Sequence, residues 1–372
     1  MKKQISEYDS LLELLEDLDR ESVTAIQRRE VYNRFLNLQA RKKGIPMHGV
    51  FELTPLCNLD CKMCYVHVTP EQMGKQSLLT IDQWKALMSE AVAAGLMDAT
   101  LTGGECLTYP GFDELYRYLH AQGVQIGVIT NGLLLTEERI AFFRDHPVGG
   151  IQVSVYGSDD DTYERVTGHR VYSRVLANIK NAIDANLPVK VGITPSKQMG
   201  KDDECLLDML CEMRIPFTLN SNLFAARPET GRSIDDYEQS AEDYIRLRKH
   251  YMKCKGIALP QPCEELGSVR FPAVGIQCGA GNTSFTCDWR GRMYACAMLP
   301  DITAYPLKVG FSQAWQDIRK QTQAYPNPVE CNTCRFSSMC TKCVAAHRGG
   351  ALPGHANPRI CMLTKMISES ET

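Results

Sequence analysis

The sequence predicts an α/β fold of six parallel βα units followed by a small cysteine-rich domain. From residue 49 to about residue 223, short apolar segments alternate with amphipathic helical segments, which is the pattern of consecutive βαβ units. From Cys278 onward the composition changes abruptly to eight cysteines among many glycines and prolines. A domain with eight thiols on so small an apolar core needs metal to fold.

The βα units can be placed along the chain. Thr80 is a good helix N-cap, with Gln83 at the third helical position, and Gly95 is a good stop for the same helix. We expect strands at 48–54, 99–103, 124–130, 150–156, 189–194 and 216–221, and helices at 80–94, 110–121, 136–145, 171–185 and 203–213.

Four segments follow from this pattern. Residues 1–47 form an N-terminal helical segment, since leucines recur at helical spacing from Glu7 to Arg41. Residues 48–225 form the βα units, residues 226–277 a helical connector, and residues 278–372 the cysteine-rich domain. We expect the last segment to be poor in long helices.

Composition narrows the class of protein. The 372 residues carry a net charge of −3 and no block of lysine and arginine, so we expect no nucleic-acid partner. No apolar run is long enough to span a membrane and the N-terminus lacks the apolar core of a signal peptide, so we expect a cytoplasmic protein. Sixteen cysteines in such a chain indicate metal or cluster ligation, not disulfides.

Three cysteines stand together directly after the first predicted strand. Cys57, Cys61 and Cys64 have the spacing C-x3-C-x2-C. Three thiolates can hold three irons of a cubane cluster and leave the fourth iron open, and an open position distinguishes a catalytic metal site from a closed structural one. The alternative is a zinc knuckle built from Cys61 and Cys64 with a distant cysteine pair.

This cysteine motif resembles that of the radical S-adenosylmethionine (SAM) enzymes. The resemblance implies a 4Fe-4S cluster whose open iron is chelated by the amino and carboxylate groups of the methionine moiety. Reductive cleavage of the sulfonium then yields a 5′-deoxyadenosyl radical that abstracts hydrogen from a substrate. The resemblance also implies a partial (β/α)6 barrel, with the active site at the C-terminal ends of the strands.

The second strand ends in Gly103, Gly104 and Glu105. Glycines allow backbone to approach a ligand closely, and a carboxylate accepts hydrogen bonds from an ammonium group. By resemblance, this Gly-Gly-Glu motif binds the methionine amino group. We expect Cys106, which follows, to be a packing residue.

Four further residues take a cofactor role by the same resemblance. Tyr65 would lie against the adenine, and Asn131 and Ser154 near the ribose and methionine. Arg165 would pair with the methionine carboxylate as a bidentate donor. The alternative for Arg165 is a solvated charge at the end of a helix.

The C-terminal cysteine order resembles that of the SPASM domain, which holds two auxiliary 4Fe-4S clusters. The chain departs from the usual spacing before Cys343 and around Cys287. Two zinc sites are the alternative, because they also need four thiolates each. Position by position, the resemblance assigns Cys278, Cys287, Cys296 and Cys343 to the first cluster, and Cys331, Cys334, Cys340 and Cys361 to the second.

These features predict an oxygen-sensitive radical enzyme that forms a thioether or carbon-carbon crosslink in a ribosomally made peptide. Closing such a bond requires the substrate radical to lose an electron, and an auxiliary cluster is a suitable acceptor. The N-terminal segment is too short for a fused leader-binding domain, so a separate protein would bind a leader. A flavodoxin- or ferredoxin-type protein would supply the electron for SAM cleavage.

Three alternatives stay open. A sulfatase-maturing enzyme would carry an aspartate where this chain has Ala297. A peptide epimerase needs a thiol as hydrogen donor, for which Cys106 or Cys254 is available. A non-enzymatic iron-sulfur electron carrier would need neither the open cysteine loop nor the Gly-Gly-Glu motif. We expect Cys205, Cys211, Cys254 and Cys263 to be packing residues, and Tyr156, Asn220, Asn222 and Arg227 to contact a substrate.

Overall fold

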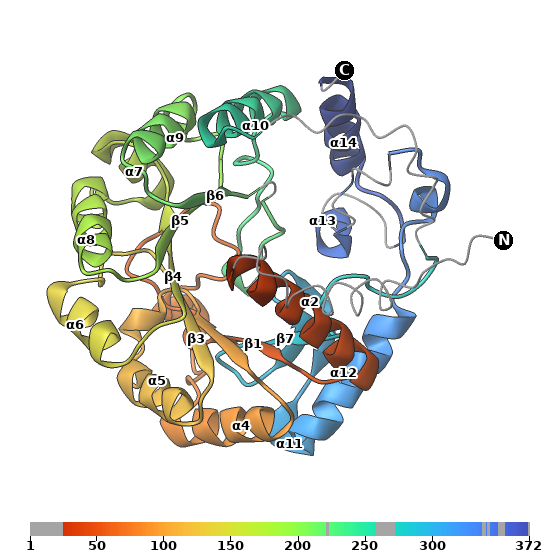
Figure 1. Cartoon of the computed structure of the whole chain (residues 1–372). Coiled ribbons are helices and arrows are strands. Elements are labelled where there is room, and N and C mark those ends of the chain that lie inside the picture. Colours follow the sequence, from red (N-terminus) through yellow and green to blue (C-terminus); the bar gives the residue numbers. More distant parts are fainter. Residues whose placement is uncertain are drawn as a thin grey trace.

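The computed structural model describes residues 25–220, 223–257, 272–336, 340, 343–348 and 354–370. Within them one sheet runs in the order β6-β5-β4-β3-β2-β1-β7-β8-β9, and Figure 1 shows helices along its outer side. The strands are β1 (His48–Glu52), β2 (Asp98–Thr102), β3 (Gln125–Thr130), β4 (Gly150–Val155), β5 (Val189–Ile193), β6 (Phe217–Leu219), β7 (Ser284–Cys287), β8 (Met293–Cys296) and β9 (Leu299–Ala304).

Helices alternate with the first six strands and continue into the C-terminal part. The α-helices are α2 (Ala25–Lys43), α3 (Pro70–Met73), α4 (Ile81–Ala93), α5 (Phe112–Ala121), α6 (Glu137–Asp145), α7 (Asp160–Thr167), α8 (Tyr172–Asp184), α9 (Asp202–Glu212), α10 (Ala241–Lys255), α11 (Pro306–Val309), α12 (Phe311–Ala324), α13 (Val344–Arg348) and α14 (Pro358–Ser370). Short 3-10 helices are η2 (Cys106–Thr108), η3 (Pro228–Thr230) and η4 (Val329–Thr333).

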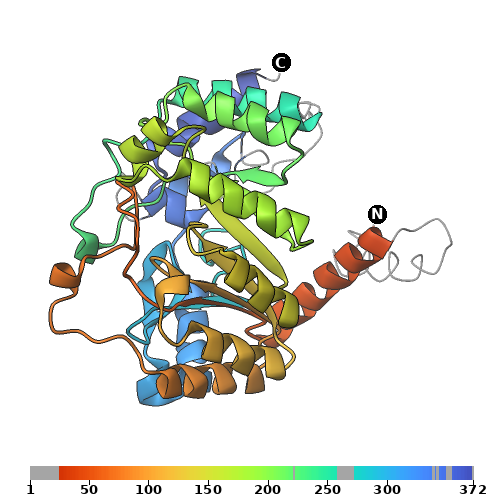
Figure 2. The ribbon, with the colours of Figure 1, turned by 90° about the vertical axis from the view of Figure 1, so that its left-hand side faces the viewer.

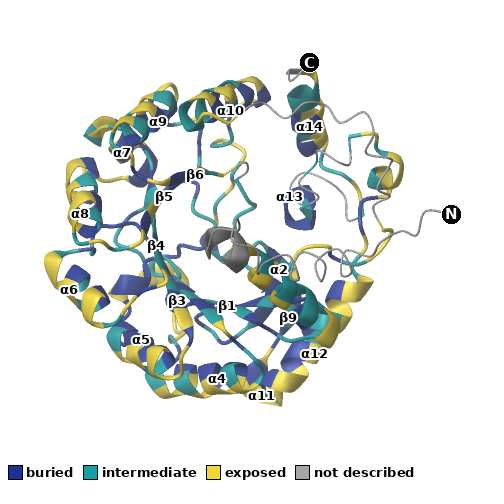
Figure 3. Cartoon of the chain, in the orientation of Figure 1, coloured by how far each residue is buried: buried dark blue, intermediate teal, exposed yellow. Residues whose placement is uncertain are grey.

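The six predicted parallel strands and the helices between them are confirmed. Neighbouring strands from β1 to β6 pair in parallel, as consecutive right-handed βα units require. The predicted capping box is present, because Thr80 Oγ1 accepts a hydrogen bond from the Gln83 amide at 3.2 Å. Figure 3 shows the buried faces of the helices turned toward the sheet. One such contact joins Trp84 of α4 to Phe51 of β1, edge to face.

Three strands of the sheet were not predicted. β7 pairs in parallel with β1, so that Cys287 lies opposite Phe51, and β8 and β9 continue as an antiparallel meander. The cysteine-rich segment therefore begins as an extension of the barrel sheet. Its strands are only four to six residues long, and β7 and β8 each end in a cysteine, so their alternation is hard to recognise in the sequence.

The expectation of few long helices after residue 278 is wrong. α12 has 14 residues and buries Phe311, Ala314, Trp315 and Ile318, which have the i, i+3, i+4, i+7 spacing of an amphipathic helix. α14 has 13 residues and packs against α10. The many cysteines of this segment obscure the helical periodicity in the sequence.

The N-terminal helix α2 projects away from the sheet, as Figure 2 shows. Its last turn is fixed to the C-terminal part by Arg41, which donates to the Gln277 carbonyl at 2.6 Å. The part of the predicted helical segment before residue 25 lies outside the described residues. Across the described residues, no helix combines the length and the apolarity needed to cross a membrane.

Candidate active site

The three-cysteine loop leaves the C-terminal end of β1 and is held by the end of β2. The Gly104 amide donates to the Thr54 carbonyl at 2.6 Å, and the Glu105 amide to the Leu56 carbonyl at 2.9 Å. A Cβ atom on Gly103 or Gly104 would come within 2.3 Å of these same two carbonyl oxygens. The two glycines are therefore required where the β2 end approaches the chain just before the first cysteine.

A second set of contacts fixes the far side of the loop. The Asp60 and Lys62 amides donate to carbonyls at the end of α7, at 2.9 and 3.0 Å. Arg232, from the segment after β6, donates to the Cys61 carbonyl and to the Asp60 carboxylate. Arg232 was not predicted as a site residue, because no local motif marks it.

The loop thiols are buried or half-buried, and two of them receive amide hydrogen bonds. The Leu59 amide donates to Cys57 Sγ at 3.4 Å, and the His67 amide to Cys64 Sγ at 3.3 Å. Burial raises the pKa of Cys57 to about 12, and burial also raises the pKa of Cys61. Thiolates here need cationic iron to stabilise them, and the N–H···S bonds favour the charged form.

Among the described residues, the cysteine sulfurs are not gathered as closely as they would be around one zinc ion. Sulfurs on one tetrahedral zinc ion lie about 3.8 Å apart, since Zn–S bonds measure about 2.3 Å. Throughout the described part of the chain, no three cysteine sulfurs lie within 4.8 Å of one another.

Glu105 is fully buried and occupied by its own chain. Its carboxylate accepts from the amides of Leu107 at 3.0 Å and Asn131 at 2.8 Å, and from the Thr130 hydroxyl at 2.9 Å. Burial raises its pKa, against these hydrogen bonds. The carboxylate thus ties the β2 end to the β3 end, and its contact with a methionine amino group stays a prediction. Cys106 beside it is completely buried, as expected for packing.

Asn131 connects the β3 end to the cysteine loop. Its side-chain amide donates to the side-chain oxygen Oδ1 of Asn58 at 2.7 Å and to Cys57 Sγ at 3.6 Å. Ser154 in β4 hydrogen-bonds with Tyr156, whose hydroxyl also bonds Cys61. Asn131 and Tyr156 therefore contact the cysteine loop directly, and Ser154 reaches it through Tyr156.

Arg227 has a different place from the one expected. It is 3% exposed and forms a bidentate ion pair with Glu52, at 2.7 and 2.8 Å. Its guanidinium also donates to the Ala297 carbonyl at 3.2 Å and lies 5.7 Å from the centre of the Tyr65 ring. The expectation that Arg227 contacts a substrate is wrong, because a buried, paired guanidinium is not available to one.

The structure does not bring Arg165 to the other predicted cofactor residues. It is exposed on α7, where it donates to the Thr162 hydroxyl at 2.8 Å and to the Gln198 carbonyl at 3.4 Å. This position favours the alternative of a solvated charge at a helix end. Asn220 is exposed and donates to the Thr194 hydroxyl, and Asn222 lies outside the described residues.

The C-terminal thiols fall into two groups by their mutual electrostatic interactions. Burial raises the pKa of Cys296 to about 11, and the thiols that add to this shift are Cys343 and Cys278. In the second group, burial likewise raises the pKa of Cys331 to about 11, with contributions from Cys334, Cys340 and Cys361.

Cys287 stands apart from both groups. It is fully buried in β7, and the charges that act on its thiol are those of Asp288 and Glu52. The structure therefore does not bring it to Cys278 and Cys296, with which sequence analysis grouped it. Sequence order alone placed it between them, whereas the β7 pairing with β1 directs it into the core.

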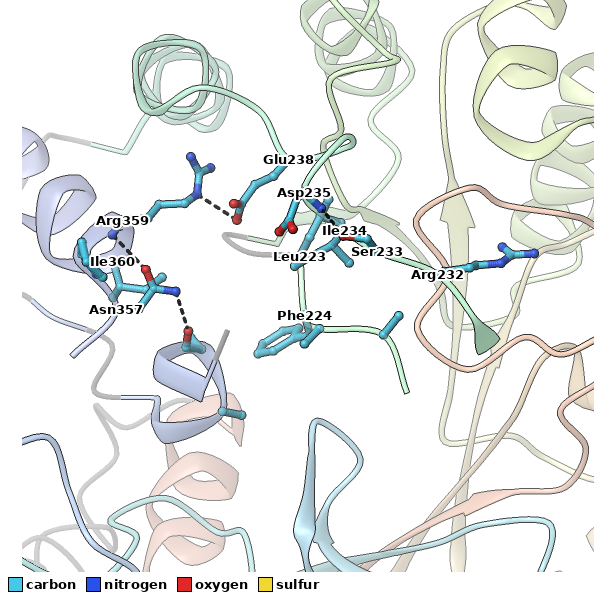
Figure 4. Close-up of a pocket in the computed structure, with 15 residues that line it drawn as sticks. Leu223, Phe224, Arg232, Ser233, Ile234, Asp235, Glu238, Asn357, Arg359 and Ile360 are labelled. Carbon is cyan, nitrogen blue, oxygen red and sulfur yellow. Dashed lines mark hydrogen bonds and ion pairs between the residues drawn. The ribbon is translucent and has the colours of Figure 1, made fainter. Parts of the chain in front are cut away.

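A pocket of about 510 Å³ lies near these groups, and Figure 4 shows residues from two parts of the chain around it. Arg232 lies on one side of the pocket, and its guanidinium points away from the other lining residues and bonds the Cys61 carbonyl. Ile360, next to Cys361, lies on the opposite side of the pocket. The pocket is lined by Leu223, Phe224, Ala225, Ala226, Arg232, Ser233, Ile234, Asp235, Glu238, Ala345, Ala346, Asn357, Pro358, Arg359 and Ile360.

Comparisons with known proteins fit this arrangement. The AdoMet-dependent heme synthase of Methanosarcina barkeri is 26% identical over 320 residues, which cover 79% of this chain and 90% of that protein. The antilisterial bacteriocin subtilosin biosynthesis protein AlbA of Bacillus subtilis is 25% identical over 359 residues, covering 90% and 75% respectively.

The fold is that of a solved structure, Streptococcus suis SuiB bound to S-adenosylmethionine. The TM-score is 0.67 at 16% identity, and the match covers 96% of this chain and 88% of SuiB. Residues 51–210 match the Radical SAM superfamily, whose members use a 4Fe-4S cluster and S-adenosylmethionine. This match spans β1 to α9, with the Cys57, Cys61 and Cys64 loop at its start, so these residues form a Radical SAM domain.

Proposed function

We propose that this chain is a radical SAM enzyme that forms a thioether or carbon-carbon crosslink in a ribosomally made peptide. The observation that carries the proposal is the pocket. Its lining includes Arg232, which bonds the Cys61 carbonyl, and Ile360, the neighbour of Cys361. A peptide bound there lies between the loop that holds the radical cluster and the C-terminal thiols.

The residues present fit a cluster on the Cys57, Cys61 and Cys64 loop. Three thiols, one buried and two half-buried, provide three ligands, two of them with N–H···S bonds, and leave one position for S-adenosylmethionine. When bound, the cluster supplies the electron that cleaves the sulfonium to a 5′-deoxyadenosyl radical. The chain orients this site through Asn131, and through Glu105 it fixes the neighbouring strand ends.

The C-terminal thiols support two auxiliary clusters with different ligand sets. Cys331, Cys334, Cys340 and Cys361 give one cubane a full set of cysteines. Cys278, Cys296 and Cys343 give the other only three, since Cys287 lies in the core. We assign residues 48–225 to the barrel, 226–277 to the connector and 278–372 to the auxiliary domain, with β7–β9 joining that domain to the barrel sheet.

Two relatives support a peptide substrate. AlbA is a bacteriocin biosynthesis protein, and SuiB has been solved bound to a precursor peptide, SuiA. The pocket offers a peptide both apolar and polar contacts, from Leu223 and Phe224 to Asp235 and Asn357. A separate leader-binding protein and a flavodoxin- or ferredoxin-type reductant complete the proposed system.

The heme synthase relative raises a tetrapyrrole as the second candidate substrate. Tetrapyrroles carry several carboxylates and require cations that are free to meet them. The two cationic residues in the pocket lining are both engaged, since Arg359 pairs with Glu238 at 2.8 Å and Arg232 with Asp60. The charge of the pocket therefore favours a peptide.

Mass spectrometry of the product tests the proposal. The reconstituted protein is incubated without oxygen with S-adenosylmethionine, a reductant and the short peptides encoded beside its gene. A crosslinked peptide is two hydrogens lighter than its precursor, whereas an epimer made in ordinary water keeps the mass. The proposal is wrong if a tetrapyrrole substrate leads to 5′-deoxyadenosine formation whereas none of the peptides tested does.

A further inference from the structure

Helices α9 and α10 pack against each other on the outside of the barrel and bring together four metal-ligating side chains. Asp208 and Cys211 are three residues apart on α9, and His250 and Cys254 are four residues apart on α10. Both spacings place their two side chains on one face of a helix. None of the four belongs to the cysteine groups described above.

The ligand atoms already converge. Asp208 Oδ1 lies 2.7 Å from His250 Nε2 and accepts a hydrogen bond from Cys254 Sγ at 3.6 Å. The carboxylate, imidazole and thiol atoms all lie within 4.8 Å of one another. The Cys211 thiol hydrogen-bonds with Cys254 but lies outside this set of three, so it becomes the fourth ligand only if its side chain turns toward the ion.

We propose that Asp208, Cys211, His250 and Cys254 bind one zinc ion that fastens α10 to α9. Zinc prefers nitrogen and sulfur ligands, accepts carboxylate oxygen, and is four-coordinate in structural sites. With Zn–O, Zn–N and Zn–S bonds of about 2.1, 2.05 and 2.3 Å, tetrahedral geometry separates O from S by about 3.6 Å and O from N by about 3.4 Å. The separation of Asp208 Oδ1 from Cys254 Sγ already has the first of these values. That of Asp208 Oδ1 from His250 Nε2 is 2.7 Å, so the imidazole would have to move away by less than about one ångström.

The setting suits a structural ion. The Asp208 side chain is 55% exposed and that of His250 is 26% exposed, so an ion can enter from solvent. Cys211 and Cys254 are half-buried and pack against the core. Helix α10 also packs against α14, whose first residues line the pocket. An ion that fastens α10 to α9 would therefore also help to hold α14 in place.

Metal analysis of the full-length protein with its clusters tests this site. After equilibration with zinc and removal of the excess, we expect one zinc per chain. X-ray absorption spectroscopy at the zinc edge, to which iron does not contribute, should show two sulfur and two nitrogen or oxygen neighbours. Competition with a chromophoric chelator should show that His250→Ala and Cys254→Ser weaken zinc binding by more than the roughly 10- to 100-fold cost of losing an outer-shell partner.

The matched control is Cys205→Ser, which removes an exposed thiol from the same helix and should leave zinc binding unchanged. Iron content and 5′-deoxyadenosine formation should also be unchanged in the His250 and Cys254 variants, which separates this site from the clusters. The proposal is overturned if no zinc is retained, if the zinc has four sulfur neighbours, or if His250→Ala binds zinc as the unaltered protein does.

Discussion

Glu52 and Arg227 form a bidentate ion pair at 2.7 and 2.8 Å in which both side chains are at most 3% exposed. Glu52 ends β1, from which the cysteine loop departs, and Arg227 follows β6. The Arg227 guanidinium also reaches the Ala297 carbonyl, next to Cys296. One buried pair thus joins the end of β1 to the segment after β6, and through Ala297 to the chain beside Cys296.

Breaking this pair should be costly. Arg227→Met leaves the Glu52 carboxylate buried without its partner, and we expect a loss of about 3–5 kcal/mol in the free energy of unfolding. The double variant Glu52→Gln with Arg227→Met should be more stable than Arg227→Met alone, because no charge is left unpaired. Thermal unfolding of the two variants checks the order, and equal stability would contradict the role of the pair.

Glu105→Gln should act on both the fold and the cofactor. A glutamine keeps only one acceptor oxygen, so one of the Leu107 and Asn131 amides faces an NH2 group, at a cost of about 1–3 kcal/mol in stability. If the carboxylate also holds the methionine ammonium, the affinity for S-adenosylmethionine falls roughly ten- to hundredfold.

Binding of S-adenosylmethionine to the folded Glu105→Gln variant separates the two effects. Unchanged affinity together with a lower unfolding temperature would leave Glu105 as a purely structural residue.

The barrel was predictable because each unit carries local signals. The capping residues, glycine stops and apolar segments of residues 48–213 depend on neighbours in sequence, and the helix ends match within two residues. The burial of Arg227 was not predictable, because its partner Glu52 is 175 residues away. The position of Cys287 likewise depends on β7 pairing with β1, a contact that sequence spacing does not encode.

Replacing Cys57, Cys61 and Cys64 together by Ala should remove one cluster. Three cubanes hold about twelve irons per chain, so the variant should hold about eight. It should form no 5′-deoxyadenosine, since the open coordination position is lost. Anaerobic iron analysis and chromatography of the nucleoside check both expectations. Full iron content in the variant would show that Cys57, Cys61 and Cys64 do not hold a cluster.

Asp203→Asn should stabilise the protein at neutral pH. Asp203 is completely buried in α9, where its Oδ2 accepts from Gln239 Nε2 at 2.7 Å, and burial raises its pKa. An asparagine can donate to Gln239 Oε1, which among the described residues has no hydrogen-bond partner.

The sign of the pH dependence follows from the raised pKa of Asp203. The folded state binds its proton more tightly than the unfolded state, so stability falls as pH rises from the unfolded pKa through the folded one. The advantage of Asp203→Asn should therefore be largest at pH 7, about 1 kcal/mol, and should vanish in acid. Thermal unfolding of both proteins from pH 4 to 8 measures this difference, and a variant that is less stable at pH 7 would contradict it.

Cys287→Ser should leave the iron content intact, whereas Cys296→Ser should lower it. The two residues are nine positions apart and end β7 and β8, but Cys287 is directed into the core, and Cys296 interacts with Cys278 and Cys343. We expect Cys287→Ser to lower the unfolding temperature, because a hydroxyl replaces a buried apolar thiol. Iron analysis and thermal unfolding of both variants decide the ligand set. Loss of iron from Cys287→Ser at unchanged unfolding temperature would make it the fourth cluster ligand, and the first auxiliary site would then be closed by cysteine.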